Sequence, residues 1–187
     1  MKVTFTRTGE RRYRVSVEGA GIDSSWMEPA PGYDRRLPHD MAHFVVENEM
    51  GIIGGIFGQL AAGGHARTFN PTGTRQKRKV AKRGERIAAA NRKDSMLSET
   101  LVYIACQSWN SGRPAVSEVE GVSPDDINRV CREFDRVSAI WSTLTIGESM
   151  TLDWRGTASG RGSRPAALRR SEKRRSQSIK RIVTRFP

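Results

Sequence analysis

The chain has 187 residues, of which 36% are apolar, and it carries a formal net charge of +12. This length predicts one domain with extensions, and the modest apolar fraction indicates that part of the chain lies outside a packed core. No run of about 18 apolar residues is present, which excludes a membrane span. The first residues alternate like a strand instead of forming a signal peptide, so we expect a cytoplasmic protein.

The positive charge is concentrated in two segments. Residues 74–93 carry a net +8 and residues 155–187 a net +10, so the rest of the chain carries −6. An acidic body with two basic segments predicts a polyanion partner, such as nucleic acid or acidic lipid, for those segments only. Cys106 and Cys131 fall within helical patterns, where we expect buried thiols of a reducing compartment.

The N-terminal residues predict a β-hairpin. Apolar residues alternate with polar ones on both sides of a break at residues 8–10, at Met1, Val3 and Phe5 and again at Tyr13, Val15 and Val17. This alternation gives the hairpin one apolar face. Because an isolated hairpin is marginal in water, other elements must cover that face. Residues 19–32 read as a loop.

A helix is expected to begin at Pro38, because proline is favoured at the first helical position. His39 and His43 are four residues apart, about 40° around the helix axis and about 6 Å along it, so their rings share one face. Two imidazoles placed in this way can bind one metal ion. The H-D-x-x-H pattern also puts Asp40 beside them, and Glu47 lies on roughly the same face, about 12 Å from His39 along the axis.

We therefore predict a divalent metal site, zinc first, with His39, Asp40, His43 and Glu47 as its ligands. Asp40 and Glu47 are also the candidate catalytic bases. Either can instead form a hydrogen bond to a metal-binding residue and orient it. Other third ligands are Asp34 and His65. In the competing interpretation these groups form only a hydrogen-bond cluster, since the helix is apolar nearly all round and its buried polar groups need partners.

Residues 37–47, Leu-Pro-His-Asp-Met-Ala-His-Phe-Val-Val-Glu, and the following Gly-Ile-Phe-Gly-Gln-Leu-Ala-Ala-Gly resemble a small bacterial family with an H-D-x-x-H core. That resemblance covers about residues 1–65 and implies no particular activity. The core is also similar to the H-D-x-x-H zinc motif of accessory proteins of ubiquinone biosynthesis, which implies that His39, Asp40 and His43 are zinc ligands. Those proteins carry a further glutamate twelve positions after the second histidine, where this chain has Gly55.

The rest of the chain predicts three further helices and a strand. A glycine-rich apolar helix follows Gly51, a second helix runs from Met96 to about Trp109, and a third starts at Ser123-Pro124 and ends by Gly147. In the second helix Leu97, Leu101, Ile104 and Ala105 form the expected apolar stripe, widened by Met96, Tyr103 and Cys106. Residues 150–154 alternate as a strand that we expect to pair with the N-terminal hairpin.

Together these elements predict an α+β domain over residues 1–154. It contains a small three-stranded antiparallel sheet, formed by the hairpin and the C-terminal strand and covered by about four helices. Residues 74–93 are a basic linker or helix inside the domain, and residues 155–187 a disordered basic tail. The first functional hypothesis is a metal-binding domain that could act as a metal-assisted hydrolase. The alternatives are a nucleic-acid-associated protein that binds through its basic segments, and a non-catalytic structural or partner-binding protein.

Overall fold

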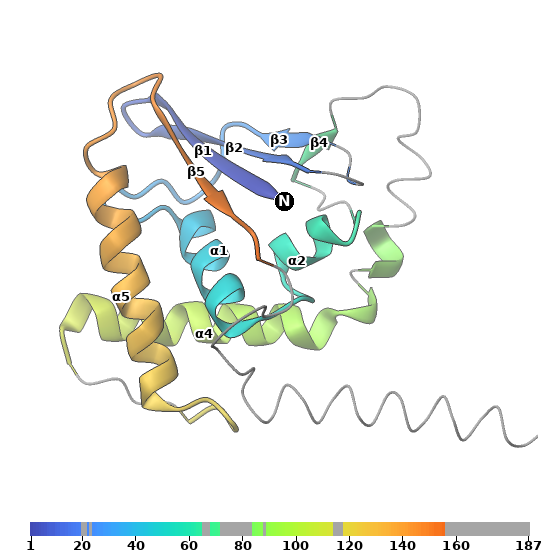
Figure 1. Ribbon diagram of the computed structural model, residues 1–187, viewed down its shortest axis with the longest axis vertical. Helices are drawn as coiled ribbons and strands as arrows, with labels where there is room; N and C mark the ends of the chain where they lie inside the picture. Colours follow the sequence, from blue (N-terminus) through green and yellow to red (C-terminus); the bar gives the residue numbers. More distant parts are fainter. Residues whose placement is uncertain are drawn as a thin grey trace, which may run out of the picture.

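The computed structural model describes residues 1–19, 22, 24–64, 68–71, 84–87, 89–113 and 118–155. In this part of the chain an antiparallel sheet carries a group of helices on one of its faces (Figure 1). The predicted α+β class is confirmed.

The predicted hairpin is the centre of the sheet. Strand β1 (Lys2–Gly9) pairs with β2 (Arg12–Glu18), and β5 (Ser149–Asp153) pairs with the other edge of β1, as expected for the last strand. The alternating apolar side chains are buried on one face: Val3, Phe5, Tyr13, Val15, Val17, Met150 and Leu152. On the opposite face Thr4 and Thr6 form side-chain hydrogen bonds with Thr151 and Ser149, at 2.9 and 2.8 Å.

Two short strands extend the sheet beyond the three that we predicted. Strand β3 (Ser25–Met27) pairs with β2, and β4 (Asn70–Pro71) pairs with β3, giving the order β4-β3-β2-β1-β5. Strands of three and two residues are too short to show an alternating pattern, so their sequences were read as loops.

Four helices lie on the apolar face of the sheet. They are α1 (His39–Met50), α2 (Ile56–Ala61), α4 (Arg92–Ser111) and α5 (Pro124–Trp141). In Figure 1, α1 and α2 lie directly beneath the sheet, and α4 runs below them. Helix α1 packs against α2, α4 and α5, which explains why its sequence is apolar nearly all round. None of the helices in the described ranges has the length and apolar character needed to cross a membrane.

The start of α5 and the end of α1 follow the predicted signals, whereas α5 ends at Trp141, before the predicted limit at Gly147. Helix α5 begins with a capping box, in which Ser123 and Asp126 each accept a hydrogen bond from the other's backbone N–H. Helix α1 ends at Gly51, whose φ of 64° is left-handed and favours glycine. Helix α4 begins at Arg92, four residues before the predicted start at Met96.

The buried face of α4 differs from the predicted stripe. Its buried residues are Ser98, Leu101, Val102 and Ala105. Met96 and Tyr103, which we expected to widen the apolar face, are 65% and 66% exposed. Leu101 and Ala105 of the predicted stripe are buried, and Leu97, Ile104 and Cys106 pack half-buried against the core. The prediction is therefore confirmed in part, with the buried face turned toward Ser98.

Most of the basic residues lie outside the described part of the chain. Residues 72–83 and 156–187 are not among the described residues, whereas 84–87 are helical and the basic segment ends in the first turn of α4. Binding of nucleic acid through residues 74–93 and 155–187, and the disorder of the tail, therefore stay predictions.

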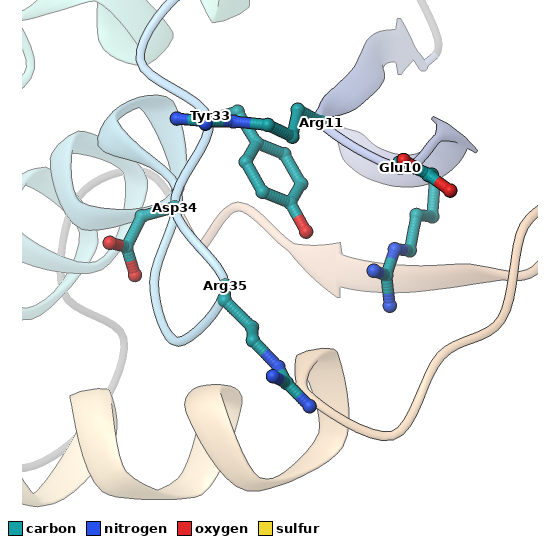
Figure 2. Close-up of a pocket in the computed structure, with 6 residues that line it drawn as sticks. Glu10, Arg11, Tyr33, Asp34 and Arg35 are labelled. Carbon is teal, nitrogen blue, oxygen red and sulfur yellow. The ribbon is translucent and has the colours of Figure 1, made fainter.

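One open pocket lies where the β1–β2 turn meets the loop that leads into α1 (Figure 2). Residues from both segments line it, and it is considered separately below.

Candidate metal centre

Helix α1 presents three polar side chains along one line. His39, His43 and Glu47 are spaced by four residues, so each lies one turn beyond the last. His39 is exposed at the start of the helix, whereas His43 and Glu47 are completely buried. The line therefore runs from the surface into the core.

The two histidine rings lie together, as their spacing predicts. Their centroids are 4.6 Å apart at an interplanar angle of 65°. Glu99 of α4 approaches from the facing helix, and its Oε2 lies 3.4 Å from Nε2 of His43. One ligand atom from each of His39, His43 and Glu99 lies within 4.8 Å of the other two, an arrangement compatible with a metal site.

The other nitrogen of His43 is held by a serine. Nδ1 of His43 lies 3.1 Å from Oγ of Ser98, and that hydroxyl donates a hydrogen bond of 2.9 Å to Oε1 of Glu47. Because a carboxylate only accepts, the serine proton points to Glu47 and the serine oxygen accepts from Nδ1–H. This chain of contacts places the ring proton of neutral His43 on Nδ1, which leaves the lone pair on Nε2.

Nε2 of His43 is buried and has no hydrogen-bond partner among the described residues. Burial by itself would lower the pKa of His43, but the neighbouring carboxylates Glu47, Glu99 and Asp40 raise it above its ordinary value. The electrostatic field around Nε2 therefore favours a positive charge there, either a proton or a metal cation.

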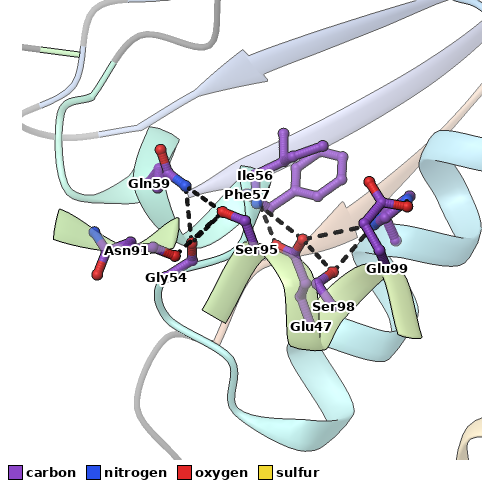
Figure 3. Close-up of polar contacts among 10 residues, drawn as sticks. Glu47, Gly54, Ile56, Phe57, Gln59, Asn91, Ser95, Ser98 and Glu99 are labelled. Carbon is purple, nitrogen blue, oxygen red and sulfur yellow. Dashed lines mark hydrogen bonds and ion pairs between the residues drawn. The ribbon is translucent and has the colours of Figure 1, made fainter. Parts of the chain in front are cut away.

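Glu47 is bound to the start of helix α2. Its two carboxylate oxygens accept hydrogen bonds of 2.9 Å from the backbone N–H groups of Ile56 and Phe57, and Oε1 also accepts from Ser98 (Figure 3). A carboxylate at this position satisfies N–H groups that have no partner within the helix. Glu47 thus links α1, α2 and α4, and both of its oxygens are occupied.

The close fit of Glu47 requires a glycine at position 55. A Cβ placed on Gly55 would lie 2.2 Å from Cδ of Glu47, so the carboxylate fills the space of a side chain at that position. The backbone of Gly55, with φ −74° and ψ −175°, suits any residue. Glycine is therefore needed here for space and not for its conformational freedom.

We expect Gly55→Ala to lower the free energy of unfolding by about 1–3 kcal/mol, the usual cost of overpacking a buried site. Urea denaturation monitored by circular dichroism measures it. In a protein that already carries Glu47→Ala, adding Gly55→Ala should lower the free energy of unfolding by almost nothing further, because truncation of Glu47 frees the space. Equal costs in both backgrounds would show that the two residues are not coupled.

Asp40 is hydrogen-bonded to a tyrosine of the sheet. Its Oδ2 accepts a hydrogen bond of 2.5 Å from the hydroxyl of Tyr13, which also lies 2.6 Å from the carbonyl oxygen of Pro31. Burial raises the pKa of the Asp40 carboxyl, and the contacts with Tyr13 and the histidines only partly offset this. Asp40 therefore fastens the start of α1 to the sheet.

The other residues that we considered as ligands lie elsewhere. Oδ1 of Asp34 accepts hydrogen bonds from the backbone N–H groups of Arg36 and Leu37, which shapes the loop before α1. His65 lies outside the described residues. Of the four predicted ligands, the structure brings His39 and His43 together and gives Asp40 and Glu47 other partners.

Ser98 and Glu99 were missed from the sequence. Ser98 interrupts the buried positions of α4, with Leu101, Val102 and Ala105 at the following core spacings. A single serine on an apolar helix face needs a buried hydrogen-bond partner, and this need was the one indication in the sequence that Ser98 contacts another polar group. Glu99 is an exposed acid like many others, so nothing in the sequence separates it from the rest of the helix surface.

The separations suit a small divalent cation. Two ligands of tetrahedral zinc, each about 2.1 Å from the ion, are about 3.4 Å apart. Nε2 of His43 and Oε2 of Glu99 already lie 3.4 Å apart. His39 and Glu99 are exposed and have room to move toward one ion.

No family model matches this chain, and no curated protein or solved structure shows significant similarity to it. What it does must therefore be inferred from its own residues.

Proposed function

We propose that this protein binds one divalent metal ion, with zinc the first candidate, through His39, His43 and Glu99. The observation that carries the proposal is the buried Nε2 of His43, which has no hydrogen-bond partner among the described residues and lies 3.4 Å from a carboxylate oxygen. Buried polar atoms are rarely left without a partner, and a bound cation would satisfy this one.

The contacts behind His43 support the same conclusion. A metal-binding histidine usually donates its other ring N–H to an oxygen, which fixes the ring and its tautomer. Here the Oγ atom of Ser98 accepts a hydrogen bond from Nδ1 of His43, and the Ser98 hydroxyl donates a hydrogen bond to Glu47. Glu47 therefore positions a ligand through Ser98, and we assign it this role in place of the predicted role of ligand or base.

Two histidines and one carboxylate are a donor set of hydrolytic zinc sites. Such a set leaves a coordination position open, and a metal bound there supplies an acidic water at neutral pH. The activity that the site supports best is therefore metal-assisted hydrolysis. The same donors also suit iron(II), so the identity of the metal must be measured.

The similarity to the zinc motif of ubiquinone-biosynthesis accessory proteins supports the two histidines as ligands. It does not extend to the carboxylate, because their additional glutamate corresponds to Gly55. We propose that Glu99 of α4 takes the place of that carboxylate. Asp40, the middle residue of the motif, supports the helix start through Tyr13.

Metal content tests the proposal directly. We expect protein purified without a histidine tag to contain about one divalent metal ion per chain by elemental analysis. His39→Ala and Glu99→Gln should each weaken zinc affinity about a hundredfold or more, since each removes one of three ligands. Both side chains are exposed, so the variants should fold normally.

Glu18→Gln is the matched control for Glu99→Gln, because it removes the same charge from an exposed residue on β2. It should leave zinc affinity unchanged. If the wild-type protein binds no divalent metal, or if both ligand variants bind zinc as tightly as the control, the polar cluster is only a structural one.

A further inference from the structure

A second site lies at the opposite end of the hairpin from the chain start. It is an open pocket of about 570 Å³, a volume within the usual range for small-molecule sites. It is lined by Arg7, Glu10, Arg11, Tyr33, Asp34 and Arg35, from β1, the β1–β2 turn and the loop before α1. Half of these residues are arginines.

Arg7 lies on the helix-covered side of the sheet. It continues the inward row of Val3 and Phe5 on β1, and its side chain is half-buried. Nη1 of Arg7 donates a hydrogen bond of 2.7 Å to the carbonyl oxygen of Leu144, but Nε is buried without a hydrogen-bond partner in the described residues. A partly buried guanidinium that no described carboxylate neutralises favours an anion beside it.

None of the three arginines forms an ion pair with a described carboxylate. This contrasts with Arg14, Arg129 and Arg136, which pair with Glu28, Glu49 and Asp126, and Glu133. The arginines of the pocket are therefore available to an external ligand.

Of the two acidic residues that line the pocket, only Glu10 faces the open space, so only Glu10 would repel a bound anion directly. The Asp34 carboxylate points away from the open space in Figure 2, and its Oδ1 is occupied by two backbone N–H groups. The Tyr33 hydroxyl points into the space between Glu10 and Arg35. The ring of Tyr33 is held by Tyr13 and Trp141, with centroids 6.5 Å away in both cases, so this donor has a fixed place.

We propose that this pocket binds a small ligand through a phosphate or carboxylate group, held by Arg7 and the Tyr33 hydroxyl, with the positive charges of Arg11 and Arg35 at the rim of the pocket. The planar guanidinium matches both oxyanions, because it offers parallel N–H donors to two oxygens. This site is separate from the metal centre and does not depend on it.

NMR of full-length protein labelled with ¹⁵N-arginine tests the proposal, with inorganic phosphate and succinate as probes in a chloride buffer that contains no other carboxylate or phosphate. We expect saturable shifts of arginine Nε–Hε signals with at least one probe, and the preferred probe identifies the group. Arg11→Gln and Arg35→Gln should each weaken binding severalfold, because each removes a positive charge from the rim of the pocket. Tyr33→Phe should weaken it less.

Two further variants separate the pocket from general attraction to a basic protein. Arg12→Gln removes the same charge from an exposed neighbour that does not line the pocket, and it should leave affinity unchanged. Glu10→Gln should raise affinity severalfold, because it removes a negative charge that faces the ligand. Equal affinities in Arg12→Gln, Arg11→Gln and Arg35→Gln, or shifts that never saturate with either probe, would overturn the proposal.

Discussion

A His43→Leu variant will fold, but zinc will no longer stabilise it. A metal that binds only the folded state raises the free energy of unfolding by about 4 kcal/mol at a thousand times its dissociation constant. We expect that gain for the wild-type protein and none for the variant. Without metal the two proteins should differ by about 1 kcal/mol, because leucine replaces a buried polar group that lacks one of its partners. Urea denaturation with and without zinc measures both differences.

Thr100→Ala is a suitable control, because Thr100 is exposed on α4 next to Glu99 and its hydroxyl bonds only to the backbone of its own helix. It should keep the full gain from zinc. If His43→Leu keeps that gain as well, zinc binds elsewhere on the chain. If the variant instead loses several kcal/mol without metal, His43 is a structural residue.

Glu47→Gln will be the most destabilising of the conservative substitutions in this region. A glutamine side chain turns an NH₂ group toward backbone N–H donors that the carboxylate now accepts from, so at least one buried donor loses its acceptor. It also removes the negative charge beside His43 and the helix terminus. We expect the free energy of unfolding to fall by about 3–5 kcal/mol, the range found when one partner of a buried charge network is removed.

Glu49→Gln provides the comparison on the same helix. Glu49 pairs with Arg129 at 3.6 Å near the surface, and its loss should cost about 1 kcal/mol or less. Chemical denaturation in EDTA compares the two variants without a contribution from metal. A loss from Glu47→Gln no greater than that from Glu49→Gln would contradict the role of Glu47 as the link between three helices.

Local patterns in the sequence predicted much of the framework. Alternation predicted β1, β2 and β5, and the proline before His39 and the glycine after Met50 predicted the limits of α1. The spacing of four residues predicted that His39 and His43 share a face, because a helix fixes that geometry whatever surrounds it. These predictions depend only on neighbouring residues.

The third member of the candidate site could not be predicted in this way. Glu99 reaches His43 only because α4 packs across α1, a contact between residues 56 positions apart in the sequence. The buried face of α4 is turned toward Ser98, which contacts Glu47 and His43, whereas the apolar pattern predicted a face widened by Met96 and Tyr103. The sequence does not show which buried polar side chains will contact one another, and this was the missing information.

The roles of Asp40 and Glu47 show the same limit. Both were expected near the histidines because they are close in sequence, yet each meets a partner from another element, Tyr13 of β2 for Asp40 and the start of α2 for Glu47. An acid beside a histidine in the sequence was a good indication that the region carries buried charge. Glu47 does lie beside the ring, with Oε1 3.8 Å from Nδ1 of His43, but nothing near the histidines in the sequence indicated that Glu99 would face Nε2.

The position of β1 between β2 and β5 has a consequence for synthesis on the ribosome. β1 precedes the described helices in the chain, but its second neighbour is complete only at Asp153, and Trp154 N–H then bonds to the carbonyl oxygen of Met1 at 2.9 Å. Until then one side of β1 offers unsatisfied backbone groups to any other nascent strand. The growing polypeptide is therefore open to misassociation along this edge of β1 while the described helices between β2 and β5 are being made.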